Sequence, residues 1–157
     1  MRHPGPGPVQ LEDRCAGTTS TFKGQTEKLY GDGNDTPSFV STVSAKMRQD
    51  PSIDAVTVLG PALAVAVQQQ LEQDGNTAKI ATYAFTSDLI PLLQNGKVAF
   101  TIDQQPYLQG YLSIDSLWLY IRNHSVIGAQ QSVPTGPVVV NKDNIGEILP
   151  YVNEGLR

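Results

Sequence analysis

Residues 54–84 read DAVTVLGPALAVAVQQQLEQDGNTAKIATYA, and this stretch decides the fold. The run from Asp54 to Leu59 is short, apolar and rich in β-branched residues, as expected for a buried parallel strand. Gly60-Pro61 then begins a helix that we expect to reach about Gln73, because proline costs little in a first helical turn. Lys79 to Ala84 is the next expected strand. A strand, a helix and a second strand in this order predict a parallel βαβ unit.

The same alternation extends on both sides of this stretch. Further strands are expected at Glu27–Tyr30, Val98–Ile102 and Pro137–Val140, and further helices at Leu11–Phe22, Thr36–Gln49, Asp88–Gln94, Pro106–Asn123 and after Asn144. The sequence therefore predicts an α/β fold, with a parallel sheet of about five or six strands and helices on both faces. On such sheets, ligands bind at the carboxyl ends of the strands.

The composition excludes several classes of function. The chain has 157 residues, which fits one domain, and a net charge of −4 with no run of basic residues, so no nucleic-acid partner is expected. The apolar stretch from Ala55 to Val67 is interrupted by Gly60-Pro61 and is too short to span a membrane. Cys15 is the single cysteine, so no internal disulfide can form.

The sequence contains no recognisable catalytic set. Its two histidines, His3 and His124, have no serine or cysteine partner at a known spacing, and there is no G-x-S-x-G motif. We therefore expect no catalytic residue, no cofactor and no metal site, and we do not expect an enzyme.

The segment from Asp103 to Tyr111, DQQPYLQGY, has an unusual composition. Two amides stand at the end of a strand, a proline opens the next helix, and tyrosines lie on either side. Amides can donate to and accept from hydroxyls, and aromatic rings can cover the apolar face of a sugar. The same residues would also suit a helix start with ordinary packing tyrosines, and both interpretations remain open from the residues alone.

At this segment the chain resembles the type I periplasmic binding proteins for sugars, the ribose-, galactose- and inositol-binding group. It is similar to the substrate-binding proteins of sugar ABC transporters in actinobacteria. Four segments carry the resemblance, in order and at suitable spacing: Leu11–Gly17, Asp50–Val56, Ile102–Tyr111 and Thr135–Val140.

This resemblance implies a two-lobed clamp that closes on a sugar. Arg14 stands where the family has an arginine that reaches sugar hydroxyls, and Gln104 stands at the ligand-contacting position of the hinge. Gly60 occupies a loop where several relatives have a ligand-contacting asparagine, and Asp35 lies near a loop that covers the ligand. Ala84 replaces an aspartate that commonly binds two hydroxyls in the family.

The resemblance also implies a division of the chain. Residues 1–105 would form the C-terminal lobe of the clamp, and residues 106–135 a helix and loop that pack on the other lobe. Residues 136–157 would add the closing strand and helix. On this interpretation the chain is a C-terminal portion that begins near the first crossover and lacks the N-terminal lobe, so a monosaccharide or polyol would bind weakly to this chain alone.

Partners and location follow from the same resemblance. The intact family member would serve an ABC permease and would be periplasmic or extracellular, attached to the membrane, although residues 1–8 show no apolar export signal. The helix at residues 106–123, without its cover, predicts self-association. The alternative function is the effector-binding domain of a lactose-repressor-type regulator, which shares the fold.

Overall fold

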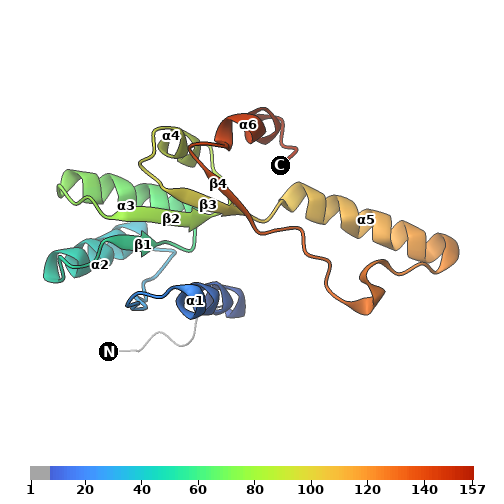
Figure 1. The fold of residues 1–157 in the computed structure, drawn as a ribbon, viewed down its shortest axis with the longest axis horizontal. Coiled ribbons are helices and arrows are strands. Elements are labelled where there is room, and N and C mark those ends of the chain that lie inside the picture. Colours follow the sequence, from blue (N-terminus) through green and yellow to red (C-terminus); the bar gives the residue numbers. More distant parts are fainter. Residues whose placement is uncertain (1–7) are drawn as a thin grey trace. The chain divides into compact units, whose positions relative to one another are not determined.

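The computed structural model describes residues 8–157, which divide into two compact units between Thr82 and Tyr83. The first unit contains α1 (Val9–Thr21), α2 (Thr36–Gln49), β1 (Ala55–Thr57), α3 (Pro61–Gln73) and nearly all of β2 (Lys79–Tyr83) (Figure 1). The second contains α4 (Leu89–Gln94), β3 (Phe100–Asp103), α5 (Pro106–Asn123), a short 3-10 helix (Ile127–Gln130), β4 (Val138–Asn141) and α6 (Ile145–Asn153).

The first unit is built on the predicted βαβ motif. β1 and β2 are parallel, with Ala55 opposite Lys79 and Thr57 opposite Ala81. Beyond the ladder, the backbone N–H of Val58 donates to the carbonyl of Ala81 at 2.9 Å. The buried hydroxyl of Thr82 donates to the carbonyl of Val58 at 2.8 Å. The parallel pairing of β1 and β2 is therefore confirmed. The two hydrogen bonds of Val58 continue it one residue past the end of β1.

Helices α2 and α3 pack against each other in this unit. Buried apolar residues of the first unit come from both helices and both strand regions: Val43, Met47, Val58, Ala64, Val67, Leu71, Ile80 and Ala81. Gly75, with φ of +68°, ends α3, and the N–H of Asn76 returns to the carbonyl of Leu71 at 2.8 Å. This is a glycine C-cap, and it satisfies a carbonyl that the helix would otherwise leave open.

A polar link also joins α2 to the end of α3. The hydroxyl of Ser44 donates to the carboxylate of Asp74, and Gln70 donates to the same carboxylate at 2.9 Å. These hydrogen bonds, with the nearby guanidinium of Arg48, lower the pKa of Asp74 from its ordinary value of 3.8. The carboxylate therefore stays charged in the folded chain at neutral pH.

The second unit pairs its strands in the opposite sense. β3 and β4 are antiparallel, with Phe100 opposite Asn141 and Asp103 opposite Val138. The α/β class is confirmed, but the expected all-parallel pairing is wrong for the last strand, because the chain returns from α5 in the reverse direction. Helices α4 and α6 contact each other in this unit. Its buried apolar residues are Leu89, Ile90, Leu93, Val98, Val140 and Ile145.

The strand expected at Glu27–Tyr30 does not form. These residues carry no regular structure and are exposed, with Leu29 at 44% and Tyr30 at 51% exposure, so no core rewards a strand there. Ion pairs hold the segment instead, from Lys28 to Glu12 at 3.4 Å and from Lys46 to Glu27 at 2.8 Å. The described chain accordingly has four strands, fewer than the sequence predicted.

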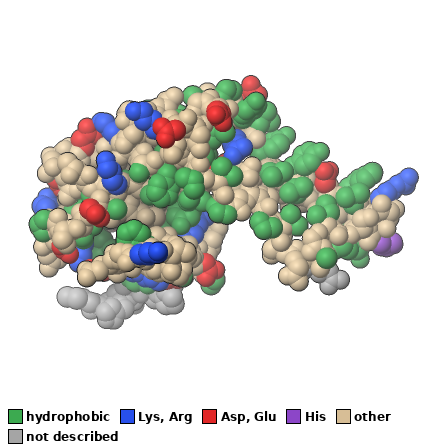
Figure 2. Space-filling view, in the orientation of Figure 1, with side chains coloured by type: hydrophobic (Ala, Val, Ile, Leu, Met, Phe, Trp, Pro, Cys, Tyr) green, Lys and Arg blue, Asp and Glu red, His purple; other side chains and the backbone are tan. Residues whose placement is uncertain are grey.

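Helix α5, with 18 residues, differs in burial from α2 and α3, which both contribute buried residues to the core. The structure describes all of its residues, and none of them is buried. Its large apolar side chains are exposed, including Ile114 at 69%, Trp118 at 61% and Ile121 at 72%. Figure 2 shows hydrophobic side chains gathered along the length of α5. Among residues 8–157, no helix combines the length and the hydropathy needed to cross a bilayer.

Candidate ligand-binding site

Two predicted site residues of the first unit lie next to each other. Arg14 comes from α1, and its guanidinium donates to the carbonyl of Leu59 at 3.2 Å. Leu59 follows the end of β1 and immediately precedes Gly60. The hydrogen bond therefore holds a cationic, multidentate donor at the carboxyl end of a parallel strand, where ligands bind on such sheets.

Gly60 is the N-cap residue of α3 and has an extended backbone, with φ of −144° and ψ of 136°. A Cβ added at this position would meet no described atom within 4 Å. Neither close packing nor backbone conformation therefore requires glycine here. The position has room for a larger side chain such as asparagine.

Asp35 has a structural role in the first unit. It is the N-cap of α2, and its carboxylate accepts the N–H of Ser38 at 3.0 Å. Thr36-Pro37 follows as a first turn that needs little internal hydrogen bonding. A cap at Asp35 was not predicted from the sequence, where the helix was expected to begin at Thr36. Contact between Asp35 and a ligand stays a prediction.

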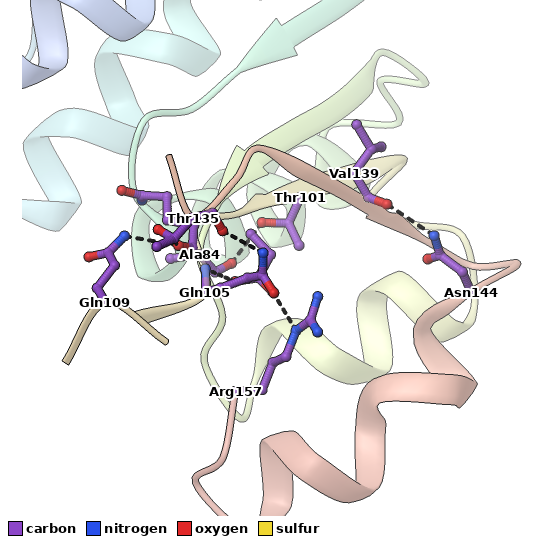
Figure 3. A network of polar contacts seen from close by, with 10 residues as sticks. Ala84, Thr101, Gln105, Gln109, Thr135, Val139, Asn144 and Arg157 are labelled. Atoms are coloured by element: carbon purple, nitrogen blue, oxygen red, sulfur yellow. Dashed lines mark hydrogen bonds and ion pairs between the residues drawn. The ribbon is translucent and has the colours of Figure 1, made fainter. Parts of the chain in front are cut away.

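Ala84 follows β2 with a left-handed backbone, at φ of 62°. Its N–H donates to the carbonyl of Ile102 at 2.9 Å. Its carbonyl accepts the hydroxyl of Thr101 at 2.7 Å (Figure 3). The backbone of Ala84 is thus fully engaged. Aspartate and asparagine tolerate a left-handed backbone better than most residues do, so the conformation suits the aspartate that the family commonly has here.

Gln104 lies where two segments of the second unit meet, residues 103–105 and residues 135–138, which we call the crossing. The carbonyl of Gln104 accepts two hydrogen bonds of 2.9 Å, from the hydroxyl of Thr135 and from the side-chain amide of Gln109. The side-chain amide of Gln105 donates to the carbonyl of Thr135 (Figure 3). The backbone of Gln104 is therefore fixed on both sides.

The crossing depends on a glycine and on a buried carboxylate. A Cβ at Gly136 would lie 2.9 Å from the carbonyl oxygen of Asp103, so only glycine allows this approach. Asp103 is completely buried and accepts the N–H of Gln105 at 2.8 Å and the Nε of Arg157 at 2.7 Å. Two donors of this kind offset the cost of burying the charge.

The sequence analysis missed Asp103, Thr135 and Arg157 as members of this network. For Asp103, the available signal in the sequence was an acidic residue between a strand and a helix-opening proline. For Thr135, it was the sequence Thr-Gly-Pro before the last strand. Arg157 is 54 residues away from Asp103 in the sequence, and no local pattern indicates their pairing.

The five predicted site residues divide between the two units. Arg14, Asp35 and Gly60 belong to the first unit, whereas Ala84 and Gln104 belong to the second. Within the second unit, a hollow of about 280 Å³ lies between α5 and the segment that follows it, and none of the five lines it. Among residues 8–157, no group of three histidine, cysteine, aspartate or glutamate side chains could hold a metal ion.

Comparisons with known proteins indicate the family to which this chain belongs. The family model described as periplasmic binding protein domain matches residues 4–125. The xylose/arabinose-binding protein XylF of Sulfolobus acidocaldarius is 27% identical over 150 residues, covering 89% of this chain and 37% of that protein. A carbohydrate transporter from Acidothermus cellulolyticus 11B, solved in complex with myo-inositol, is 46% identical with a TM-score of 0.87, covering 95% of this chain and 52% of that one.

A LacI transcriptional regulator from Bacteroides fragilis shares the fold alone. It is 21% identical with a TM-score of 0.57, and the match covers 69% of this chain and 37% of the regulator. This likeness does not favour a regulatory function. The chain spans 52% of the Acidothermus protein and 37% of the Sulfolobus protein, so it corresponds to part of each relative's length.

Proposed function

Because this chain belongs to the periplasmic binding protein domain family, we propose that it is part of the solute-binding component of an ABC importer for a sugar or polyol. The observation that carries the proposal is the 46% identity, over 95% of the chain, to a carbohydrate transporter holding myo-inositol. The family is one of binding proteins, and in our proposal this chain binds its solute without catalysis.

The proposed solute site is formed by Arg14, Gly60, Asp35, Ala84 and Gln104. Support comes from Arg14, whose guanidinium is held at the end of β1, and from Gln104, whose backbone is pinned at the crossing. A guanidinium and a primary amide supply several donors in fixed directions, and a polyhydroxylated solute offers acceptors in fixed directions. In this proposal Gly60 contributes backbone and space, and Ala84 contributes space because its backbone groups are already bonded within the chain.

The chain provides one side of a clamp in this proposal. Residues 1–105 form one lobe, residues 106–135 pack on the stretch of the relatives that this chain does not match, and residues 136–157 add the closing strand and helix. The exposure of α5 supports this division, because a helix with seven large apolar or aromatic side chains exposed is typical of a surface that another part of a protein covers. Without that cover, α5 joins a second copy of the chain.

The complete protein works with an ABC permease, outside the cytoplasm and attached to the membrane. Clamps of this kind bury the solute between two lobes, and a lobe by itself leaves the solute open to water. This chain alone therefore binds a sugar with a millimolar or weaker dissociation constant, on the order of −4 kcal/mol.

Calorimetry tests the proposal with three samples: this chain, the half of the Acidothermus protein that it does not match, and the two joined in one polypeptide. The titrants are myo-inositol, arabinose and xylose. We expect heat of binding of at least one titrant to the joined protein, with affinity at least about a hundredfold above that of either half. Ala84→Asp in the joined protein should increase affinity further, because it adds a charged acceptor. A folded joined protein that binds none of the three would contradict the proposal.

A further inference from the structure

The crossing contains a buried ion pair that the proposed site residues do not explain. Asp103 is completely buried, whereas the side chain of its partner Arg157 is 23% exposed. Arg157 follows α6, so the pair ties the end of the described chain to the start of α5. Burying a carboxylate costs free energy unless hydrogen-bond donors are well placed around it. Here both oxygens of Asp103 have a donor.

The carboxylate of Asp103 acts directly on the backbone beside Gln104. One oxygen accepts the N–H of Gln105, whose left-handed backbone has φ of 55° and ψ of 62°. A left-handed conformation is unfavourable for a residue other than glycine. The hydrogen bond that the N–H of Gln105 donates to Asp103 offsets part of this cost and sets the direction in which the chain leaves Gln104.

The side-chain amide of Gln104 is available for a hydrogen bond to a ligand. The carbonyl of Gln104 is engaged by Thr135 and Gln109, whereas its side-chain amide makes no hydrogen bond to any residue among 8–157. The surrounding polar groups of the crossing are thus paired with one another, and this half-buried amide remains available. Holding the backbone of such a group in advance reduces the entropy lost when a ligand binds.

We propose that Asp103 and Arg157 are positioning residues, which orient the amide of Gln104 toward a hydroxyl of the solute. The proposal rests on the proposed function, because it needs a polyhydroxylated ligand at Gln104. Asp103 and Arg157 do not contact the solute. They act by fixing the backbone of residues 103–105 against residues 135–138 (Figure 3).

Nuclear magnetic resonance of the isotopically labelled 157-residue chain provides the test, since it measures weak binding residue by residue. The probes are myo-inositol, arabinose and xylose, each titrated in turn, and Gln104→Glu identifies the side-chain amide signals of Gln104. In the unchanged chain we expect these signals to shift and saturate with at least one probe. Asp103→Asn and Arg157→Gln should each weaken that binding about fivefold, the ratio expected for one poorly placed hydrogen bond.

Two further variants separate positioning from stability. The double variant Asp103→Asn with Arg157→Gln removes both charges, so it should recover stability relative to Arg157→Gln but not affinity. Asn144→Ala is the control, because it removes two side-chain hydrogen bonds elsewhere on β4, to the carbonyl of Val139 at 3.0 Å and from the N–H of Asn141 at 2.9 Å. It should leave affinity within twofold. If the charge variants do not fold, Thr135→Val, which removes one bond to the Gln104 carbonyl, should still weaken binding.

The possible results separate this inference from the proposed function. Unchanged affinity in the folded variants, or solute-dependent shifts that leave the Gln104 amide unmoved, would overturn the positioning role and leave the proposed function standing. If no signal shifts with any probe, and the joined protein used for calorimetry also fails to bind, the proposed function and the positioning role are both overturned. Loss of affinity in the variants, with the control unchanged, supports the proposal.

Discussion

The crossing and helix α5 are adjacent in the sequence and opposite in what they bury. At the crossing, the carboxylate of Asp103 is completely buried and both of its oxygens have donors within the same unit. A few residues later, α5 has no buried residue and exposes a run of apolar and aromatic side chains. The polar groups of the crossing find their hydrogen-bond partners within the same unit, whereas most of the apolar surface of α5 is exposed to water.

The difference teaches how to identify a region that depends on a partner. A buried polar group must be paired inside the structure, so a complete network is evidence that its region is self-contained. An exposed apolar face costs free energy in water, so it indicates that a surface belongs against something else. By these criteria, substitutions at the crossing should change the stability of this chain, and substitutions on α5 should change its association.

The largest expected effect is at Asp103. Asp103→Ala leaves the guanidinium of Arg157 and the N–H of Gln105 without their acceptor, and we expect the free energy of unfolding to fall by about 3 kcal/mol. Urea unfolding followed by circular dichroism measures this. The matched control is Asp143→Ala, an exposed aspartate of the same unit, with an expected change within about 0.5 kcal/mol. Equal effects of the two substitutions would show that the crossing is not held by the buried pair.

Two glycines give the next comparison, one at the crossing and one in α5. Gly136→Ala places a Cβ 2.9 Å from the carbonyl oxygen of Asp103, and we expect a loss of about 2 kcal/mol because backbone must shift. Gly110→Ala in α5 meets nothing within 4 Å in the described structure, and we expect a gain of up to about 1 kcal/mol from helix propensity. The same urea measurement applies. Destabilisation by Gly110→Ala would mean that α5 is more closely packed than its exposure indicates.

Much of the fold could be predicted from the sequence because its signals are local. The apolar run at 54–59, the Gly60-Pro61 helix start and the strand at 79–84 define the parallel unit, and the structure confirms it. The strand expected at Glu27–Tyr30 was wrong, because β propensity without a buried face gives no stability there. The antiparallel direction of β4 was also missed, since it depends on where the chain goes after α5.

The site could be predicted only in part. A resemblance to a family indicated Arg14 and Gln104, and the structure gives each a hydrogen bond that fixes its place. The supporting residues could not be found in the same way, because the Asp103–Arg157 pair joins positions 54 residues apart.

A smaller effect is expected at the polar link between α2 and α3, which sharpens the comparison because it lies closer to solvent than the crossing. The hydroxyl of Ser44, then Gln70, lowers the pKa of Asp74 below its ordinary value of 3.8, which the unfolded chain should approach. A group with a lowered folded pKa adds stability above its unfolded pKa and loses it as the pH falls through the folded pKa.

Ser44→Ala removes the largest of these contributions. We expect the unchanged chain to lose more stability than the variant does when the pH falls from about 5 to about 2, since the two converge once Asp74 is protonated. Thermal unfolding across this range measures the difference. Thr42→Ala, whose hydroxyl bonds only to a carbonyl within α2, is the control and should keep the original pH dependence. A Ser44→Ala profile parallel to the unchanged chain would exclude a role for this hydrogen bond.

The smallest effect on stability is expected for the exposed face of α5. Leu117 and Ile121 lie one helical turn apart and are 57% and 72% exposed. Changing both to serine should alter the free energy of unfolding by at most about 1 kcal/mol, because these side chains are largely in water already and each exposed substitution contributes up to about 0.5 kcal/mol.

The effect of the same variant on association should be large. Sedimentation at rising concentration should show dimers or larger species for the unchanged chain and a monomer for the variant. Ser113→Ala and Ser116→Ala, on the same helix, provide the control and should preserve association. If the unchanged chain stays monomeric at high concentration, α5 does not bind a second copy of the chain. If the variant is strongly destabilised, Leu117 and Ile121 are packed within the chain itself.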